Sequence, residues 1–263
     1  MYNGYLGCKN FDENTKIWRY LKYDFFEFLL KERKLWFSRV DRFDDKFEGW
    51  SPETDESRHA IFEMYKRHTY ANCWHKKNHE SFLMWKVYGN DINNKGIAIQ
   101  STFQRLKQSL DEELKLEQYI NEMKYIDLDN DNTDPEKITI RPFFRKSKEY
   151  DDEHEIRALI QIIDPKEWSL HTEKILIPVR LHELIENIYL SPDASEDTYN
   201  SVQDVVKKYG LKIPVKPPRK KPPENKSYAG LSINIIKNSG TDPSGNYVFN
   251  EGGVVDIFGQ NKH

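Results

Sequence analysis

The sequence contains little cysteine: its two cysteines, Cys8 and Cys73, lie far apart in unlike surroundings. This pair does not indicate a disulfide framework, which is typical of small secreted proteins rather than of proteins in a reducing compartment. The first residues lack the charged and then apolar pattern of a signal peptide, and no apolar run approaches the length of a membrane span. We therefore expect a cytoplasmic protein with no membrane partner.

Net charge is also small. The formal charge is −3 and the pI about 6.3, so no overall field attracts the protein to nucleic acid. A nucleic-acid partner bound through a local basic cluster stays open, although the net charge does not support it. Aromatic residues, in contrast, make up 13% of the chain, which argues against disorder and allows a sizeable core.

Signatures of nucleotide and metal sites are missing as well. The apolar segment 96–102 carries neither G-x-G-x-x-G nor G-x-x-x-x-G-K, which argues against a Rossmann or kinase-type function. Cys73-x-His75-x3-His79 has residue types that bind zinc, but no second Cys/His pair lies close by to complete four ligands. We expect no metal, and we interpret Cys73 as a small buried residue.

Hydrophobic periodicity predicts an α+β fold with a mixed, mainly antiparallel sheet and peripheral helices. Alternating or continuous apolar runs mark the strands, and apolar residues at helical spacing mark the helices. Strands are expected at 17–21, 35–39, 70–75, 96–102, 153–163 and 175–179, and helices at 55–68, 81–88, 103–116, 181–188 and 195–209, with a further helix near Phe25.

Paired prolines mark one boundary in the chain. Pro217-Pro218 and Pro222-Pro223 flank a basic run, and such pairs favour an extended, stiff segment. We predict a single domain at 1–215, a Pro/Lys-rich linker at 216–228 and a short Gly-rich extension at 229–263. The extension is too short to bury much core alone.

The strongest candidate for a working site is the alternation Glu153-x-Glu155-x-Arg157, which runs directly into an apolar segment. If the three share one strand face, they place charges at the edge of a core, where charges are costly unless paired or used. One carboxylate would then act as a general base or on a sugar hydroxyl, and the other would position an acceptor or pair with Arg157. A solvated strand face with cross-strand partners explains the same pattern and stays open.

Other side chains are candidates for ligand binding. Arg19 has the chemistry of an anion clamp, because guanidinium binds phosphate through two parallel hydrogen bonds; an Arg stacked on surface aromatics is the simpler interpretation. Trp85 and Tyr88 belong to a helical stripe that favours core packing. At the mouth of a cleft, either would stack on a flat ring such as adenine or nicotinamide.

Eight short motifs stand in a fixed order along residues 15–215. They are Trp18-Arg19-Tyr20, Leu35-Trp36-Phe37-Ser38, Phe43-x3-Phe47-Glu48-Gly49, Cys73-Trp74-His75, Met84-Trp85-x2-Tyr88, Gly96-Ile97-Ala98-Ile99, Glu153-x-Glu155-x-Arg157 and Ile188-Tyr189-Leu190-Ser191-Pro192. As a set they resemble a widespread bacterial family, known as a domain of unknown function, that is similar to abortive-infection phage-resistance proteins.

The chain is also distantly similar to ADP-ribosyltransferases. These enzymes carry an Arg or His on the first core strand, a middle Ser- or Tyr-containing motif and a late Glu. Arg19 matches the first element, Ser101-Thr102 or Tyr88 the second, and Glu153-x-Glu155 the third. Phe103 follows Ser101-Thr102 where the family pattern has a second Ser, which is a departure from that pattern.

This similarity implies NAD as a substrate and assigns a role to each matching residue. Arg19 would hold the pyrophosphate, and an aromatic ring, Trp85 or Tyr88, would pack on nicotinamide. Tyr20 and Ser101 are further residues that would bind the cofactor. Glu155 would bind the ribose 2′-hydroxyl and favour the positive charge that grows as nicotinamide leaves. Glu153 would orient the acceptor, whose identity the sequence does not give.

Three hypotheses for function follow. The first is an NAD-consuming ADP-ribosyltransferase-like or glycohydrolase-like enzyme of bacterial conflict or phage defence. The second is a non-catalytic sensor or binding module that recognises protein or nucleic acid. The third is a metal-independent nuclease using Glu153, Glu155 and His154, although neighbouring residues on a strand point to opposite faces.

Overall fold

The computed structural model describes residues 12–45, 47–49, 56–89, 95–110, 116–127, 140–162 and 172–218, together with the backbone of 240–241 and 247–248. The chain divides into two compact units, residues 1–219 and 220–263. In the second unit, β12 (Gly240–Thr241) pairs antiparallel with β13 (Tyr247–Val248). From residue 219 on, the predicted linker at 216–228 lies outside the described residues. The predicted extension at 229–263 is described only at these two strands.

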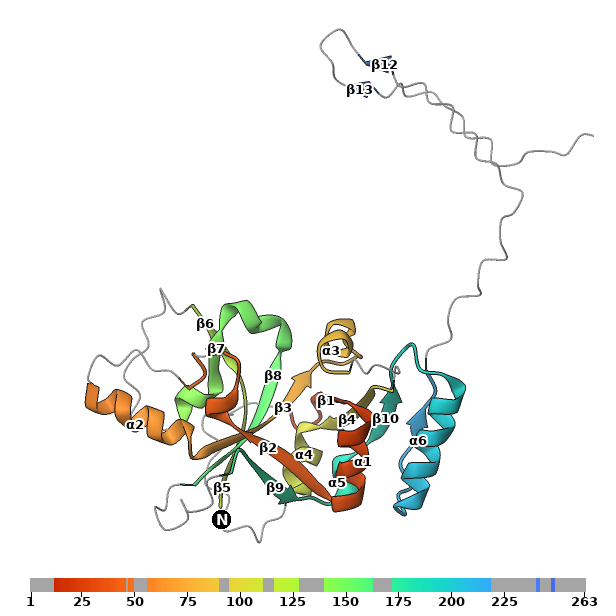
Figure 1. The fold of residues 1–263 in the computed structure, drawn as a ribbon, viewed down its shortest axis with the longest axis horizontal. Coiled ribbons are helices and arrows are strands. Elements are labelled where there is room, and N and C mark those ends of the chain that lie inside the picture. Colours follow the sequence, from red (N-terminus) through yellow and green to blue (C-terminus); the bar gives the residue numbers. More distant parts are fainter. Residues whose placement is uncertain are drawn as a thin grey trace, which may run out of the picture. The chain divides into compact units, whose positions relative to one another are not determined.

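The first unit is α+β, with a mixed, mainly antiparallel sheet (Figure 1), as the periodicity predicts. The described part of this sheet contains β1 (Lys16–Leu21), β2 (Lys34–Arg39), β3 (Thr69–Lys76), β4 (Ile97–Thr102), β5 (Glu117–Glu122), β8 (Glu155–Gln161), β9 (Lys174–Pro178), β10 (Asn187–Leu190) and β11 (Val215–Lys216). A separate parallel pair joins β6 (Lys124–Ile126) to β7 (Arg145–Ser147).

Helices connect and cover these strands. The α-helices are α1 (Tyr23–Glu32), α2 (Glu56–Lys66), α3 (Phe82–Val87), α4 (Phe103–Ser109), α5 (Leu181–Leu184) and α6 (Glu196–Lys208). Three 3-10 helices are η1 (Val40–Arg42), η2 (Arg141–Phe144) and η3 (Lys148–Glu153). Because α2 precedes β3 and α3 follows it, these two helices lie at opposite ends of that strand (Figure 1).

β3 is the strand from which the sheet divides. Along one side it pairs with β8 over all but its last residue, from Thr69↔Gln161 to His75↔Glu155. Its other side is shared: β1 pairs with its last residues and β2 with its first. Two branches therefore diverge from β3, one through β1, β4, β10 and β11 and the other through β2 and β9.

Side chains supply the hydrogen bonds at this fork, where β1 and β2 separate. Asn72 donates from Nδ2 to the carbonyl oxygen of Trp36 at 2.8 Å and accepts from Trp74 Nε1 at 2.7 Å. Arg19 donates to the carbonyl oxygen of Cys73 at 2.7 Å. Buried backbone groups need such partners, so the fork is satisfied by side chains rather than by a continuous ladder.

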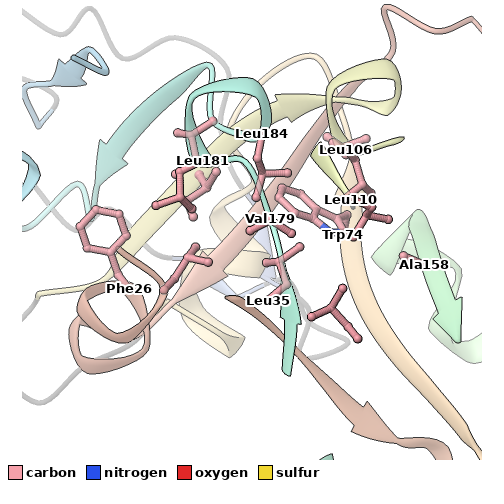
Figure 2. Close-up of a cluster of buried hydrophobic side chains, with 14 of the residues drawn as sticks. Phe26, Leu35, Trp74, Leu106, Leu110, Ala158, Val179, Leu181 and Leu184 are labelled. Atoms are coloured by element: carbon pink, nitrogen blue, oxygen red, sulfur yellow. The ribbon is translucent and has the colours of Figure 1, made fainter. Parts of the chain in front are cut away.

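The two faces of the sheet differ. One face carries the main hydrophobic core, where Figure 2 shows Phe26 of α1, Leu106 of α4 and Leu184 of α5 meeting residues of the sheet such as Leu35 and Trp74. Alternate residues of a strand point to opposite faces. Two smaller clusters therefore lie on the other face. One contains Val40, Ala71, Met123, Ile140, Phe143, Phe144 and Leu159, and the other contains Trp18, Tyr20, Met84, Trp85 and Ala98.

Several element boundaries differ from the prediction. The helix expected at 103–116 ends at Ser109, because Leu110 turns extended and bridges to Val179. The helix expected at 181–188 ends at Leu184, and residues 187–190 pair with β4 instead. Apolar residues at these places fit either a helix or a strand, and pairing with a neighbouring strand decides between them.

Candidate functional site

Two adjoining cavities lie where the sheet divides. The first has a volume of about 390 Å³ and the second about 400 Å³, and Arg19, Tyr20, Ser38 and Tyr88 line both. We call the first the acidic cavity because, among the described residues that line it, carboxylates exceed cations by one. Its carboxylates are Asp44, Asp45, Glu48, Glu153 and Glu155, and its cations are Arg19, Arg42, Lys146 and Arg157.

The second, which we call the aromatic cavity, has the opposite character. Its described lining includes Arg19, Lys22 and Lys34 but no carboxylate. Its walls carry the aromatic rings of Tyr20, Phe25, Phe28, Trp36 and Tyr88.

Arg157, a residue of β8, positions two carboxylates of the acidic cavity. Its guanidinium is fully buried and donates to both oxygens of Glu48, at 2.7 and 2.9 Å, and to both oxygens of Glu155, at 2.6 and 2.9 Å. A further bond reaches the carbonyl oxygen of Phe143. Burial opposes the charge, but the two carboxylates outweigh it and raise the pKa of Arg157. One buried cation thus holds two carboxylates in place.

Glu155 stays ionised in this setting. It is the first residue of β8 and is buried. Burial alone would raise its pKa, but the charge and hydrogen bonds of Arg157 and a hydrogen bond from Cys73 lower it. Burial and the charge of Glu155 in turn raise the pKa of the Cys73 thiol well above its usual value, so this cysteine is a hydrogen-bond donor rather than a nucleophile.

Glu153 reaches the cavity from outside the strand. It ends η3, and His154 follows in the left-handed region with φ 40°. Its carboxylate accepts hydrogen bonds from Lys146 Nζ at 2.7 Å and from the Tyr88 hydroxyl at 3.1 Å. The prediction that Glu153, Glu155 and Arg157 share one strand face is therefore wrong for Glu153, because β8 begins at Glu155.

Lys146 and Tyr88 are both influenced by Glu153. For Lys146, burial opposes the charge, but the hydrogen bond to Glu153 and the nearby carboxylates of Glu48 and Glu155 raise the pKa. For Tyr88, burial and the negative charge of Glu153 together raise the pKa. The lysine therefore stays protonated, and the phenol stays a neutral donor.

Arg19 lies at the boundary between the cavities. Its guanidinium donates to the carbonyl oxygen of Cys73, and no carboxylate forms an ion pair with it in the part of the chain that the structure describes. Burial lowers its pKa, which Cys73 and Glu155 partly offset; arginine nevertheless stays charged in proteins. A partly buried cation without an ion-pair partner is suited to an anionic ligand.

His75 also lines the acidic cavity, although the sequence did not single it out for this role. Its Nδ1 lies 2.6 Å from the carbonyl oxygen of Glu153, so it is the protonated nitrogen, because a carbonyl only accepts. Nε2 is buried without a hydrogen-bond partner among the described residues. Burial lowers the pKa of the imidazole. Its register opposite Glu155 is what brings it to the site, and only the strand pairing reveals that register.

The structure brings five of the predicted site residues together and places two elsewhere. Trp85 is buried against Tyr20, with ring centroids 4.9 Å apart, and lines neither cavity. Ser101 is buried and donates to the carbonyl oxygen of Leu184 at 2.5 Å, also away from both cavities. The residues that line the cavities are Arg19, Tyr20, Tyr88, Glu153 and Glu155.

Among the described residues, no group of three or more His, Cys, Asp or Glu side chains is placed to hold a metal ion. Within those same residues, no helix combines the length and the apolar character needed to cross a membrane.

Comparisons with known proteins give structural neighbours only. No protein-family model and no curated protein matches the chain. The complex of Thermus sp. 2.9 DarT with NAD+ is similar, at 10% identity and a TM-score of 0.38, over 79% of this chain and 98% of that one. The complex of the same protein with ADP-ribosylated ssDNA gives 11%, 0.39, 79% and 95%, and its complex with carba-NAD+ gives 10%, 0.37, 78% and 95%. Likeness at this level carries no argument about activity.

Proposed function

We propose that the cleft binds NAD and cleaves its bond to nicotinamide, as an ADP-ribosyltransferase or an NAD glycohydrolase does. The observation that carries this proposal is the opposite charge of two adjoining cavities that meet at Arg19. NAD has a matching pattern: a cationic nicotinamide ring, a central anionic pyrophosphate and an aromatic adenine. Nicotinamide suits the acidic cavity, the pyrophosphate suits Arg19, and adenine suits the aromatic rings.

The acidic cavity is suited to the charge that develops during cleavage. Among the described residues, Glu48, Glu153 and Glu155 pair with two cations, Lys146 and Arg157, so this network keeps one net negative charge. As the glycosidic bond breaks, positive charge grows on the ribosyl carbon, and fixed carboxylates stabilise it. The lowered pKa of Glu155 keeps that carboxylate ionised for this purpose.

Each bond and proton has a place in this reaction. The bond between C1′ of the ribose and the nicotinamide nitrogen breaks, and its electron pair leaves with neutral nicotinamide. A nucleophile, either water or a macromolecular acceptor, then bonds to C1′ and releases its proton. Glu153, which is fixed by Tyr88 and Lys146, lies beside Glu155 in the cavity and would orient that nucleophile.

The direct test is nicotinamide release. Wild-type protein incubated with NAD should release nicotinamide, and Glu155→Gln should slow the release by about 100-fold or more, the usual cost of removing a group that stabilises the transition state. Glu183→Gln is the matched control, since Glu183 of α5 pairs with Arg180, directly before the helix, and lines neither cavity. Absence of release from wild type, or unchanged release from Glu155→Gln, would overturn the proposal.

A role in bacterial conflict or phage defence, exerted in the cytoplasm, is the setting that we propose for this activity. It rests on the set of motifs that includes Trp18-Arg19-Tyr20 and Glu153-x-Glu155-x-Arg157. Cells that express the wild-type protein should yield fewer phage plaques than cells that express Glu155→Gln at the same level. Equal plaque numbers would overturn the proposed role in phage defence and would leave the proposed reaction untouched.

A non-catalytic binding module is the second candidate, and one observation favours it. Both oxygens of Glu155 already accept hydrogen bonds from Arg157, so this carboxylate has fewer lone pairs left for a substrate. In that case NAD would bind with no release of nicotinamide. The nuclease hypothesis has no comparable support, because His154 lines neither cavity.

A further inference from the structure

The aromatic cavity is lined by cations besides Arg19, the residue that the proposed function assigns to the pyrophosphate of NAD. Lys22, directly before α1, and Lys34, the first residue of β2, line it together with Arg19. In the described part of the chain, none of the three forms an ion pair with a carboxylate, and no carboxylate lines this cavity. Cations that line a cavity and have no acidic partners favour the binding of an anionic ligand.

Aromatic rings on the same walls indicate which other chemical group such an anionic ligand carries. Trp36 packs edge-on with Phe25 and Phe28, at ring-centroid distances of 5.7 and 6.4 Å. Phe25 remains 46% exposed, so this group of rings is not closed off as core. Lys174 Nζ lies over the Trp36 ring, 3.7 Å from its centroid, which adds a further cation beside these rings. Aromatic rings beside cations are the features that bind a nucleobase together with its phosphates.

We propose that the aromatic cavity is a subsite for an adenine nucleotide with a phosphate on its ribose, so that the cleft accepts NADP as well as NAD. This inference rests on the proposed function and deepens it. Arg19, at the junction with the acidic cavity, takes the pyrophosphate. Lys22 and Lys34 then remain for a 2′-phosphate.

The absence of a carboxylate from the described lining of the aromatic cavity supports the same conclusion. In sites of the Rossmann fold, which this chain does not have, a carboxylate accepts from the ribose 2′-hydroxyl of NAD, and a carboxylate in that position would repel a 2′-phosphate. The described lining of the aromatic cavity has two lysines and no acid. The described lining therefore has the attractive groups for a 2′-phosphate and no repulsive carboxylate among them.

The test compares two probes that undergo no cleavage, 5′-AMP and adenosine 2′,5′-bisphosphate, by calorimetry on the full chain. Wild type should bind the bisphosphate about tenfold more tightly, the effect of one added charge-assisted contact. Lys34→Gln and Lys22→Gln should each reduce that preference several-fold and leave the affinity for 5′-AMP nearly unchanged. Equal affinity of wild type for both probes, or a preference that survives in both variants, would overturn the inference.

Two controls keep the result specific. Lys31→Gln removes the same charge from an exposed lysine of α1 that lines neither cavity, and it should leave the preference intact. Trp36→Leu should weaken both probes alike, by about tenfold, because base stacking does not depend on the 2′-phosphate. If Lys31→Gln reduces the preference as much as Lys34→Gln, the effect is one of net charge and the subsite is wrong.

Failure of this inference is distinguishable from failure of the proposed function. If wild type prefers the bisphosphate but releases no nicotinamide from NAD or NADP, the subsite stands and the proposed reaction fails. If nicotinamide is released from NAD but the bisphosphate binds no better than 5′-AMP, the reaction stands and the subsite fails.

Discussion

At the scale of single residues, the shared guanidinium of Arg157 is the feature on which the site depends. It bonds two carboxylates, Glu48 from the segment before α2 and Glu155 from β8. A buried ion pair is weak evidence for stability, since desolvation offsets much of the attraction. A buried cation without any partner is costly, however, so at least one of the two carboxylates has to stay charged.

This arrangement predicts strong coupling between the two carboxylates. Glu48→Gln and Glu155→Gln each leave Arg157 one charged partner, and each should lower the free energy of unfolding by about 1–2 kcal/mol. The double variant leaves the cation with no carboxylate, and its loss should exceed the sum of the single losses by about 2 kcal/mol. Urea denaturation measures all three. Additive losses would show that Arg157 does not hold the two acids as one unit.

The buried imidazole of His75 should make the free energy of unfolding depend on pH. Burial lowers its pKa below the ordinary value, so between the folded and unfolded pKa values the unfolded chain binds more protons. Stability from this group is therefore complete above the unfolded pKa, about 6.5, and declines as pH falls from there toward the folded pKa. The free energy of unfolding of His75→Gln should decline less than that of wild type between pH 7.5 and 5.5.

A matched control for this measurement is His182→Gln, which removes an exposed imidazole from α5. It should decline with pH as wild type does. If His75→Gln follows the same slope as wild type, the buried imidazole is not responsible for this part of the pH dependence.

At the scale of elements, the fork in the sheet creates the cleft. β1 and β2 pair with different ends of β3, and between them Asn72 and Arg19 bond to groups that a continuous ladder would have satisfied. The cavities lie where the branches separate, and among the described residues no third strand fills that space. The opening for a ligand is thus a consequence of strand pairing.

Asn72→Ala tests this interpretation of the fork. The change leaves the carbonyl oxygen of Trp36 and Nε1 of Trp74 without their partner, and each buried unsatisfied group costs about 1–3 kcal/mol. The free energy of unfolding should fall by about 2–5 kcal/mol, and calorimetry should show weaker binding of NAD. Asn187→Ala, which removes a bond to Gln100 away from both cavities, is the control. A loss no larger than that of the control would mean that Asn72 does not hold the fork.

The sequence predicts the elements better than it predicts their pairing. Alternation and apolar runs locate β3, β4 and β8, because these strands are buried on both faces and their composition shows it. The register that sets His75 opposite Glu155 is a long-range property with no local signal. β5 is polar in composition and was not predicted. The helical spacing of Trp85 fits a core-facing stripe and a position at a cleft equally well. Its packing against Tyr20 shows that it belongs to the core.

At the scale of the whole molecule, the cleft belongs to one unit. Residues 1–219 contain the divided sheet and both cavities, whereas residues 220–263 form a separate compact unit. The groups proposed to bind NAD, from Arg19 to Arg157, all lie in the first unit.

Truncation after Arg219 should therefore leave the cleft working. The shortened chain should melt within about 2 °C of the full chain, because it keeps the divided sheet and its hydrophobic clusters, and it should bind NAD with an affinity within about threefold. Thermal denaturation and calorimetry measure the two quantities. A shortened chain that folds but loses its NAD affinity would assign the second unit a part in binding.

A crystal structure with carba-NAD+, a dinucleotide analogue that resists cleavage, would test whether the two cavities bind NAD as proposed. We expect the nicotinamide ring in the acidic cavity near Glu155, the pyrophosphate hydrogen-bonded to Arg19 at about 2.7–2.9 Å, and adenine in the aromatic cavity against Trp36. A dinucleotide bound outside these two cavities, or one with its adenine among the carboxylates, would contradict it.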